Sequence, residues 1–406
     1  MPESSAPKRA LRIAMFSESV LPVLNGVSIS VDTLVQELRN RGHSVHIFAP
    51  NFIRHHEKDP NTHRFRAIET PWAKGYPFAY PPFWRMLLTF RKFEFDVIHT
   101  HTPWIVGFVG MRWAESHEIP LVSTYHTLYD RYAHYLWMFP RRYIRFRIAK
   151  HTNFYYNSCE QVIAPTAAAK RWLERHGIVR PVHVIPTGIP TPPKIDKAEA
   201  RAALGIPPDL QVLLYVGRLA KEKNLETLIQ MVTIVSPAHP RARLWLVGDG
   251  PYRDDLRALA AKLGVGDRVK FVGAVPRNEV DQYYASADLF TFASVTETQG
   301  LVVQEAMQYG LPAVAISGGG ASDSIEDGVN GLVTKNVIEE FSSSVARLLA
   351  SPQELNKLAE GAHQKASESS IELMVDRILE VYELAIAGHH REAEVGEKAV
   401  GTRNLL

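Results

Sequence analysis

The stretch Ser294–Met307, SVTETQGLVVQEAM, places Glu297 and Glu305 eight positions apart. The preceding segment Ala287–Ala293, ADLFTFA, has the apolar and aromatic character of a buried strand, and apolar residues at helical spacing follow the turn-forming glycine. Glu305 is therefore expected one to two turns into a helix. Ligands of open α/β sheets bind at the carboxyl ends of strands, where the free N–H groups of a helix start also favour an anion. Both carboxylates are thus expected to face a ligand crevice.

The stretch resembles the E-x7-E motif of retaining glycosyltransferases of the GT-B fold, in particular those of family 4. The resemblance implies that Glu297 holds hydroxyls of a donor sugar and that Glu305 holds the ribose of a sugar nucleotide. A carboxylate accepts hydrogen bonds only, and it can bind two vicinal hydroxyls. Two solvated glutamates on a surface helix are the alternative, but the neighbouring residues also match the family. The resemblance adds four neighbours to the donor-binding set: Thr298, Gln299, Gly300 and Leu301.

Length and composition indicate a globular chain of two domains. The 406 residues are too many for one ordinary core, and 46% of them are hydrophobic. A net charge of only +3 gives no reason to expect a nucleic-acid partner. Cys159 is the single cysteine, which excludes an intrachain disulfide and fits a reducing cytoplasm. The N-terminus lacks the apolar core of a signal peptide, and no run of about 18 apolar residues predicts a transmembrane helix.

The N-terminal half begins with a βαβ unit. Leu11–Phe16 is a short apolar run typical of a buried parallel strand, and Val45–Ala49 is a second one. Between them, apolar residues recur at helical spacing from Val27 to Leu38, and Gly42 follows where the helix should end. The loop before this helix has no G-x-G-x-x-G sequence, which excludes an NAD-dependent dehydrogenase.

That loop ends in Asn25-Gly26 and is similar to the PxxNGVS glycine loop of family 4 enzymes. The resemblance implies that the backbone at Asn25 and Gly26 comes close to the donor phosphate or to the acceptor. A simple β–α turn is the alternative, because Asn-Gly is a common turn pair. Together with the motifs of the C-terminal half, the pattern favours a site.

Two expected strands end in histidines. Asp96–Thr102 carries His99 and His101, and Leu121–Thr127 carries His126. A zinc site is disfavoured because no carboxylate or cysteine with ligand spacing accompanies them. The resemblance to family 4 implies instead that His126 contacts the reacting sugar, where a neutral imidazole can hydrogen-bond a hydroxyl or an oxygen of developing charge. His101 is a weaker candidate, and His99 is expected to be a core residue.

Two segments rich in aromatic residues and cations suit a bilayer interface: Lys74–Phe95 and Arg141–His151. A loop that caps the core is the alternative for the first, and a solvated charged face is the alternative for the second. Periodicity does not decide whether Arg141–His151 is a helix or a strand. Lipid-glycosylating members of family 4 carry basic, aromatic helices in this part of the chain. The expected membrane contacts are Trp84, Arg85, Arg141, Arg142, Arg145, Arg147 and Lys150.

The second half begins after a hinge rich in proline and glycine, Pro186–Lys194. The strand Gln211–Val216 follows, and the next residues, GRLAKEKN, resemble the donor-phosphate motif of family 4. Arg218 and Lys223 match its two cations, which would absorb the charge that develops on a diphosphate leaving group. A charged loop before a helix is the alternative. The resemblance also implies that the glycines Gly217 and Gly248 lie near the donor and that the backbone at Val275 holds the nucleobase.

The chain is therefore expected to be an α/β protein of GT-B architecture, with two Rossmann-like domains facing each other across a cleft. The N-terminal domain comprises residues 1–188, and the nucleotide-sugar domain comprises residues 189–370. Apolar residues at helical spacing predict a helix over Ile371–Ala385, and in GT-B proteins this helix (371–388) crosses back onto the N-terminal domain. The polar residues 389–406 are expected to be a disordered tail.

The expected activity is retaining transfer of a hexose from a UDP- or GDP-sugar, with UDP-glucose favoured. No DxD-type metal motif is present, so neither a metal nor another cofactor is expected. Thr298-Gln299 makes the chain similar to bacterial diacylglycerol glucosyltransferases, which implies a lipid acceptor at the inner face of an anionic membrane and a cytoplasmic, peripheral location. The alternatives are a soluble acceptor, a GT-B sugar-nucleotide epimerase and a non-catalytic sugar-binding protein. The oligomeric state is left open.

Overall fold

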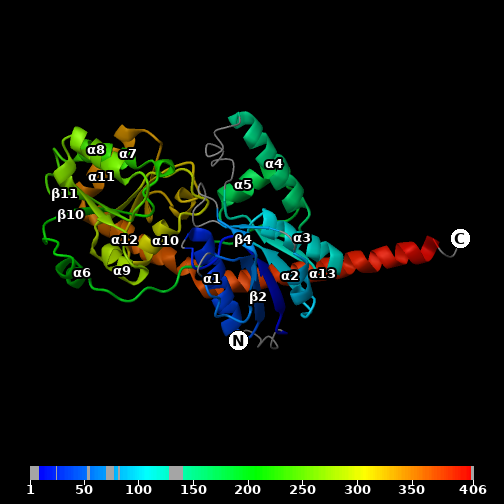
Figure 1. Ribbon diagram of the computed structural model, residues 1–406. Helices are drawn as coiled ribbons and strands as arrows, with labels where there is room; N and C mark the ends of the chain where they lie inside the picture. Colours follow the sequence, from blue (N-terminus) through cyan, green and yellow to red (C-terminus); the bar gives the residue numbers. More distant parts are fainter. Residues whose placement is uncertain are drawn as a thin grey trace, which may run out of the picture. The chain divides into compact units, whose positions relative to one another are not determined.

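The computed structural model describes residues 9–23, 25–52, 55–69, 77–80, 83–127 and 140–403. The chain divides into two compact units: unit 1 comprises Met1–Gly188 with Ile371–Leu406, and unit 2 comprises Ile189–Ser370. Each unit is built around a parallel sheet with helices packed against it, as the labels of Figure 1 show. The structure therefore has the α/β class that the alternation of strands and helices predicts.

Unit 1 contains a seven-stranded sheet in the order β3-β2-β1-β6-β7-β8-β9, and every pairing in it is parallel. The order reverses at β1, which lies between β2 and β6, and this is the kind of switch point where open α/β sheets bind ligands. A small antiparallel pair, β4 with β5, accompanies the sheet. The strands are β1 Arg12–Phe16, β2 Ser44–Pro50, β3 Thr62–Phe65, β4 Ala67–Ile68, β5 Phe78–Ala79, β6 Val97–Thr100, β7 Leu121–Thr124, β8 Gln161–Ala164 and β9 Val182–Val184.

Both faces of this sheet are buried. Ala14 and Phe16 of β1 belong to one apolar cluster, whereas Ile13 and Met15 belong to another, because successive side chains of a strand point to opposite faces. The first cluster includes residues of α2 to α5, and the second includes residues of α1 and α13. The helices are α1 Gly26–Asn40, α2 Trp84–Phe90, α3 Ile105–His117, α4 Arg141–Asn157, α5 Ala167–Arg175 and α13 Ile371–Arg403.

The segment that periodicity left undecided is a helix. α4 buries Ile144, Tyr155 and Tyr156 against the unit 1 core and exposes most of its cations. The burial of one side, rather than a regular amphipathic pattern, stabilises the helix here. The other basic and aromatic segment, Lys74–Phe95, contains the strand β5 and the helix α2 in its described part.

Unit 2 contains a six-stranded parallel sheet in the order β12-β11-β10-β13-β14-β15, with one large apolar core. Its strands are β10 Gln211–Val216, β11 Ala242–Val247, β12 Val269–Gly273, β13 Leu289–Phe292, β14 Ala313–Ile316 and β15 Gly331–Thr334. Its helices are α6 Lys197–Ala203, α7 Leu225–Val235, α8 Arg253–Lys262, α9 Arg277–Ser286, α10 Leu301–Gln308, α11 Ile338–Ala350 and α12 Pro352–Ala366. The switch point of this sheet lies at β10, between β11 and β13.

The last helix returns to unit 1, and it is longer than expected. Val375, Ile378 and Tyr382 of α13 are buried in the cluster that covers the α1 side of the sheet. The expectation of a disordered tail differs from the structure, because α13 continues to Arg403. His389 contributes to this continuation, since its ring nitrogens contact the Glu160 carboxylate and the Glu118 carbonyl. The segment contains no proline and many good helix formers, which outweigh its glycines.

Candidate functional site

The E-x7-E stretch forms a tight turn followed by α10, as its sequence predicts. Gly300 has φ +71°, a conformation that L side chains rarely adopt. The Glu297 carbonyl accepts a hydrogen bond from Gly320 N–H at 2.7 Å. A Cβ at Gly320 would lie 1.7 Å from the Thr298 carbonyl oxygen, so only glycine fits this close approach. The turn that carries Glu297 is thereby held by the glycine-rich loop after β14.

Glu297 forms an ion pair with Lys223, which lies 74 positions earlier in the chain. Lys223 belongs to the 3-10 turn Lys221–Lys223 after β10, and both side chains are mostly buried. Two further contacts join the same loops: Thr296 Oγ1 donates to the Glu222 carbonyl, and Asn224 Nδ2 donates to the Ala293 carbonyl. The structure therefore brings together one cation and one carboxylate of the expected donor site, at the carboxyl ends of the neighbouring strands β10 and β13.

The second expected cation, Arg218, is exposed and follows Gly217 at the end of β10. Gly217 has φ +148°, and Gly248 at the end of β11 packs so tightly on it that a Cβ there would lie 2.0 Å from the Gly217 carbonyl oxygen. The hydroxyl of Tyr215 donates to the Arg218 carbonyl at 3.2 Å. These contacts define the backbone of the loop and leave the Arg218 guanidinium open to a ligand.

Glu305 is buried and has two partners that the sequence did not reveal. Arg277 Nη2 lies 2.8 Å from Glu305 Oε1, and the hydroxyl of Tyr284 donates to Glu305 Oε2 at 2.8 Å. Burial and the neighbouring carboxylate raise the pKa of Tyr284, which keeps its hydroxyl a donor. A positional signal existed for Arg277, since it lies two residues after Val275, where the nucleobase is expected. Half of the Arg277 side chain remains exposed.

The three histidines of unit 1 lie together at the carboxyl ends of β6 and β7. His99 is fully buried, with Nδ1 2.7 Å from the Tyr382 hydroxyl and Nε2 2.8 Å from Thr124 Oγ1, which confirms the expectation of a core residue. His101 Nδ1 lies 2.9 Å from His126 Nε2. Burial lowers the pKa of His99 to about 3 and that of His126 to about 4. All three rings are therefore neutral at physiological pH.

The loop between β1 and α1 holds the other expected site residues of unit 1. Asn25 is the N-cap of α1, and its side-chain oxygen accepts from the N–H groups of Val27 and Ser28 at 3.0 and 2.9 Å. Gly26 is the first residue of the helix. The structure thus gives Asn25 a capping role at the start of α1.

The same loop contains a buried carboxylate that the sequence interpretation did not single out. Glu18 Oε1 accepts from Val106 N–H, in the first turn of α3, at 2.6 Å. Within the described ranges of the chain, Glu18 Oε2 is buried without a hydrogen-bond partner. Burial raises the pKa of Glu18 to about 7, although backbone N–H groups including that of Val106 oppose the shift. The sequence could have indicated Glu18 as a candidate site residue, because it lies two residues after the expected buried strand Leu11–Phe16, at the end of the strand where ligands bind.

The expected membrane contacts fall on two helices of unit 1. On α4, the aromatic side chains of Tyr143, Phe146 and Phe154 are 50%, 63% and 58% exposed. They share one side of the helix with Lys150, because positions 143, 146, 150 and 154 are spaced by three or four residues. We call these four residues the α4 outer face; the exposed cations Arg142 and Arg147 flank it, and the exposed Arg145 lies toward the other side of the helix. The side chain of Arg141 lies outside the described part.

Further exposed aromatic residues lie next to α4 and on α2. The Phe154 ring stacks on that of Phe108, and Trp104 stacks on His151, with centroids 6.2 and 4.9 Å apart. Trp104 and the neighbouring Ile105 are both more than one-third exposed. On α2, Trp84 is 55% exposed and lies under the guanidinium of Arg85. In the described residues, no helix is long and apolar enough to cross a membrane.

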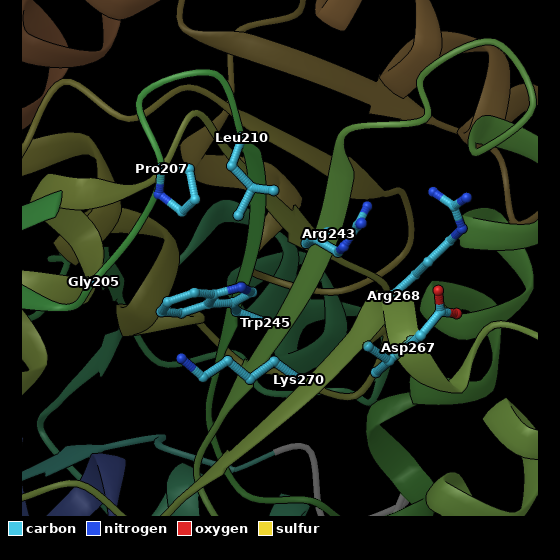
Figure 2. A pocket seen from close by; sticks show the side chains of 9 residues that line it. Gly205, Pro207, Leu210, Arg243, Trp245, Asp267, Arg268 and Lys270 are labelled. Atoms are coloured by element: carbon cyan, nitrogen blue, oxygen red, sulfur yellow. The ribbon is translucent and has the colours of Figure 1, made fainter.

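Unit 2 contains a cavity of about 430 Å³ (Figure 2). It lies where β11 and β12 begin, at the end of the sheet opposite to the carboxyl ends of the strands that carry Lys223 and Glu297. Trp245 lies at its centre, with the Lys270 ammonium 3.7 Å from the ring centroid. None of the expected site residues lines it. Where the structure describes the chain, no group of three or more His, Cys, Asp or Glu side chains is placed to hold a metal ion.

Solved structures with a similar fold include glycosyltransferases. Sucrose-phosphate synthase from Thermosynechococcus elongatus matches with a TM-score of 0.78 at 23% identity, covering 94% of this chain and all of its own. HepE from Anabaena, solved in complex with UDP-glucose, matches with a TM-score of 0.72 at 21% identity, covering 92% of this chain and 99% of its own. The two parallel sheets are thus the two Rossmann-like domains of the GT-B fold.

Sequence relatives give the family. A model described as Glycosyltransferase Family 4 matches residues 24–192, and one described as Glycosyl transferases group 1 matches residues 196–365. The alpha-monoglucosyldiacylglycerol synthase of Acholeplasma laidlawii is 31% identical over 87% of this chain and 92% of its own length. The synthase of the same name from Streptococcus pneumoniae R6 is 29% identical over 95% of this chain and 89% of its own. The chain belongs to the family 4 glycosyltransferases and is a GT-B glycosyltransferase.

Proposed function

We propose that the protein transfers a hexose, with retention of the anomeric configuration, from UDP-glucose or a similar nucleotide sugar to a lipid such as diacylglycerol at a membrane surface. The observation that carries the acceptor assignment is the α4 outer face, where three exposed aromatic rings accompany Lys150 and the exposed cations Arg142 and Arg147 flank them. Rings beside Lys and Arg suit the headgroup region of an anionic bilayer. The two relatives named alpha-monoglucosyldiacylglycerol synthase support the same assignment.

We assign donor binding to the loops at the carboxyl ends of β10 and β13. Arg218 and Lys223 neutralise the diphosphate as the glycosidic bond breaks, which makes an obligatory metal or other cofactor unnecessary. Glu297 holds Lys223 in place in the free protein and accepts hydrogen bonds from the sugar hydroxyls when the donor binds. Glu305, positioned by Arg277 and Tyr284, accepts from the ribose hydroxyls. The UDP-glucose complex of HepE supports a uridine donor.

The remaining donor contacts follow from the same loops. The turn after Glu297 presents Thr298, Gln299, Gly300 and Leu301 to the phosphates, and the glycines after β10 and β11 let the backbone approach. In unit 1, we assign His126 to an oxygen of the reacting sugar. Retention requires the acceptor hydroxyl to attack on the face from which the diphosphate leaves, so the leaving phosphate itself can take the proton and no protein base is assigned. We place the protein on the cytoplasmic face of an anionic membrane.

The experiment is to measure UDP or GDP release from a panel of sugar nucleotides, with and without anionic vesicles that contain diacylglycerol. Release from one donor that requires the diacylglycerol vesicles is the expected result, and the anomeric proton signals of the product then report retention. Release that needs a water-soluble acceptor and ignores the vesicles would overturn the lipid assignment. An inverted product would overturn the retaining mechanism.

A further inference from the structure

The histidines of unit 1 form a chain of contacts that ends at His126. His99 is locked by the hydroxyls of Tyr382 and Thr124, and its ring centroid lies 4.1 Å from that of His101. His101 in turn contacts His126 through Nδ1 and Nε2, 2.9 Å apart. His101 is 1% exposed, and its other nitrogen, Nε2, is buried with no hydrogen-bond partner among the residues that the structure describes. The contact between His101 Nδ1 and His126 Nε2 needs one proton, and either nitrogen could carry it.

The unpartnered nitrogen decides where that proton lies. A neutral imidazole carries its proton on one nitrogen and a lone pair on the other. If His101 Nε2 carried the proton, a buried N–H donor would be left unsatisfied, whereas an unsatisfied lone pair is tolerated more often in folded proteins. The proton of His101 is thus on Nδ1, the nitrogen that faces His126, and His101 Nδ1–H donates to His126 Nε2.

The reverse arrangement has a specific cost. If His126 Nε2–H donated to His101 Nδ1, the proton of His101 would have to sit on the buried Nε2. A His101 imidazolium would also carry a proton on the buried Nε2, and a His126 imidazolium would point its Nε2–H at the Nδ1–H of His101. Burial lowers the pKa of both rings, which disfavours either charged form. Only one arrangement satisfies the contact without leaving a buried donor unpaired.

We infer that His101 is a positioning residue that fixes His126 as a neutral imidazole with its proton on Nδ1. This inference rests on the proposed contact between His126 and the reacting sugar. Nδ1 of His126 has no hydrogen bond to any residue that the structure describes, and the ring is partly exposed. His126 therefore acts as a hydrogen-bond donor to an oxygen of the reacting sugar, and it does not act as a general base.

The proton position is tested directly by long-range ¹H–¹⁵N correlation spectra of the full chain labelled with ¹⁵N-histidine, because protonated and bare ring nitrogens differ in chemical shift. The His126 signals are assigned by their loss in His126→Asn. We expect His126 to be protonated on Nδ1 alone. In His101→Asp, the carboxylate is an acceptor only, so the His126 proton is expected to move to Nε2. A wild-type His126 protonated on Nε2 would overturn the inference.

The consequence for transfer is tested with paired amide variants. The Asn amide nitrogen takes the place of Nδ1, whereas the Gln amide nitrogen takes the place of Nε2. His126→Asn is therefore expected to keep UDP release within about tenfold of wild type, and His126→Gln to lose about 100-fold, because the hydrogen bond to the sugar is lost and an unpaired polar group is left facing it. His101→Asn, which keeps a donor toward His126, is expected to lose far less than His101→Asp.

These outcomes separate the inference from the proposed function. If His126 has the expected tautomer and His101→Asp changes it without lowering transfer, the positioning role is overturned while the hydrogen-bond direction stands. If the wild-type protein releases no nucleotide from any donor, the proposed function fails, but the NMR spectra still decide the proton position. Far-ultraviolet circular dichroism of His101→Asp shows whether a loss of transfer reflects unfolding, and His101→Asn then decides the role.

Discussion

At the residue scale, the residues of the proposed donor site are joined by contacts between positions far apart in the chain. Glu297 and Lys223 pair across 74 positions, and Glu305 is held by Arg277 and Tyr284. The sequence motifs identified Glu297, Lys223 and Glu305 and their chemistry, but they did not show which residues pair. Arg277 and Tyr284 of α9 could not be predicted as the partners of Glu305, because the position of α9 against α10 depends on the packing of the whole unit.

Arg218 allows a direct test of charge neutralisation. Arg218→Ala is expected to lower kcat for transfer by about 100- to 1000-fold, because a preorganised charge facing the leaving diphosphate is removed. Steady-state nucleotide release is the measurement. Lys221→Ala is the matched control, since Lys221 is an exposed cation of the same loop that the motif does not include, and it should stay within about threefold of wild type. Equal losses in the two variants would contradict a specific role for Arg218.

At the scale of single elements, α4 shows why periodicity failed. Cations occupy most sides of this helix, so the apolar positions do not stand out in the sequence. Ile144, Tyr155 and Tyr156 are buried on its inner side. Because this burial fixes the rotation of the helix, it also determines which aromatic residues remain exposed. Tertiary burial rather than intrinsic pattern sets the orientation of the helix.

The cations of α4 are expected to attract anionic lipid. The triple variant Arg142→Ser, Arg147→Ser and Lys150→Ser should weaken binding to anionic vesicles by about 100-fold, because each cation contributes about 1 kcal/mol near such a surface. Vesicle flotation at low ionic strength is the measurement, and high salt should reduce the difference between the proteins.

A matched control removes three exposed cations from other helices: Arg175→Ser, Lys262→Ser and Lys357→Ser. This variant has the same net charge as the α4 variant and should bind vesicles much more tightly. If both variants lose binding equally, the attraction follows net charge alone, and the α4 outer face is not the contact surface.

At the scale of the whole molecule, buried ionisable groups in unit 1 make stability depend on pH with opposite signs. Burial lowers the pKa of the three histidines, so they bind protons only when unfolded at mildly acidic pH, and their contribution to stability is lost as pH falls below about 6.5. The Glu18 carboxyl has a raised pKa of about 7 and behaves in the opposite way.

Glu18→Gln isolates the carboxyl contribution. Between the ordinary pKa of 4.5 and the folded value of about 7, the folded protein keeps a proton that the unfolded chain releases, so the free energy of unfolding falls as pH rises through this window. Relative to Glu18→Gln, the wild-type protein should lose about 3 kcal/mol between pH 4.5 and pH 8, an upper estimate at 1.36 kcal/mol for each pKa unit. Urea unfolding at several pH values is the measurement, and a difference independent of pH would show that Glu18 is not desolvated.

The sequence by itself determined the class of fold, the two runs of βα units, the family and the motif residues of the proposed donor site. These features depend on side-chain periodicity, turn glycines and short motifs, which are properties of neighbouring residues. Only the tertiary structure decided that α4 is a helix with an aromatic outer face and that α13 continues past its apolar part.

The tertiary structure also decided the partners of the site residues: Lys223 for Glu297, Arg277 and Tyr284 for Glu305, and His101 for His126. The physical reason is common to all of them. Each pair joins two elements whose distance and orientation follow from the strand order of a sheet and from the burial of many other side chains, and no local stretch of sequence contains that information.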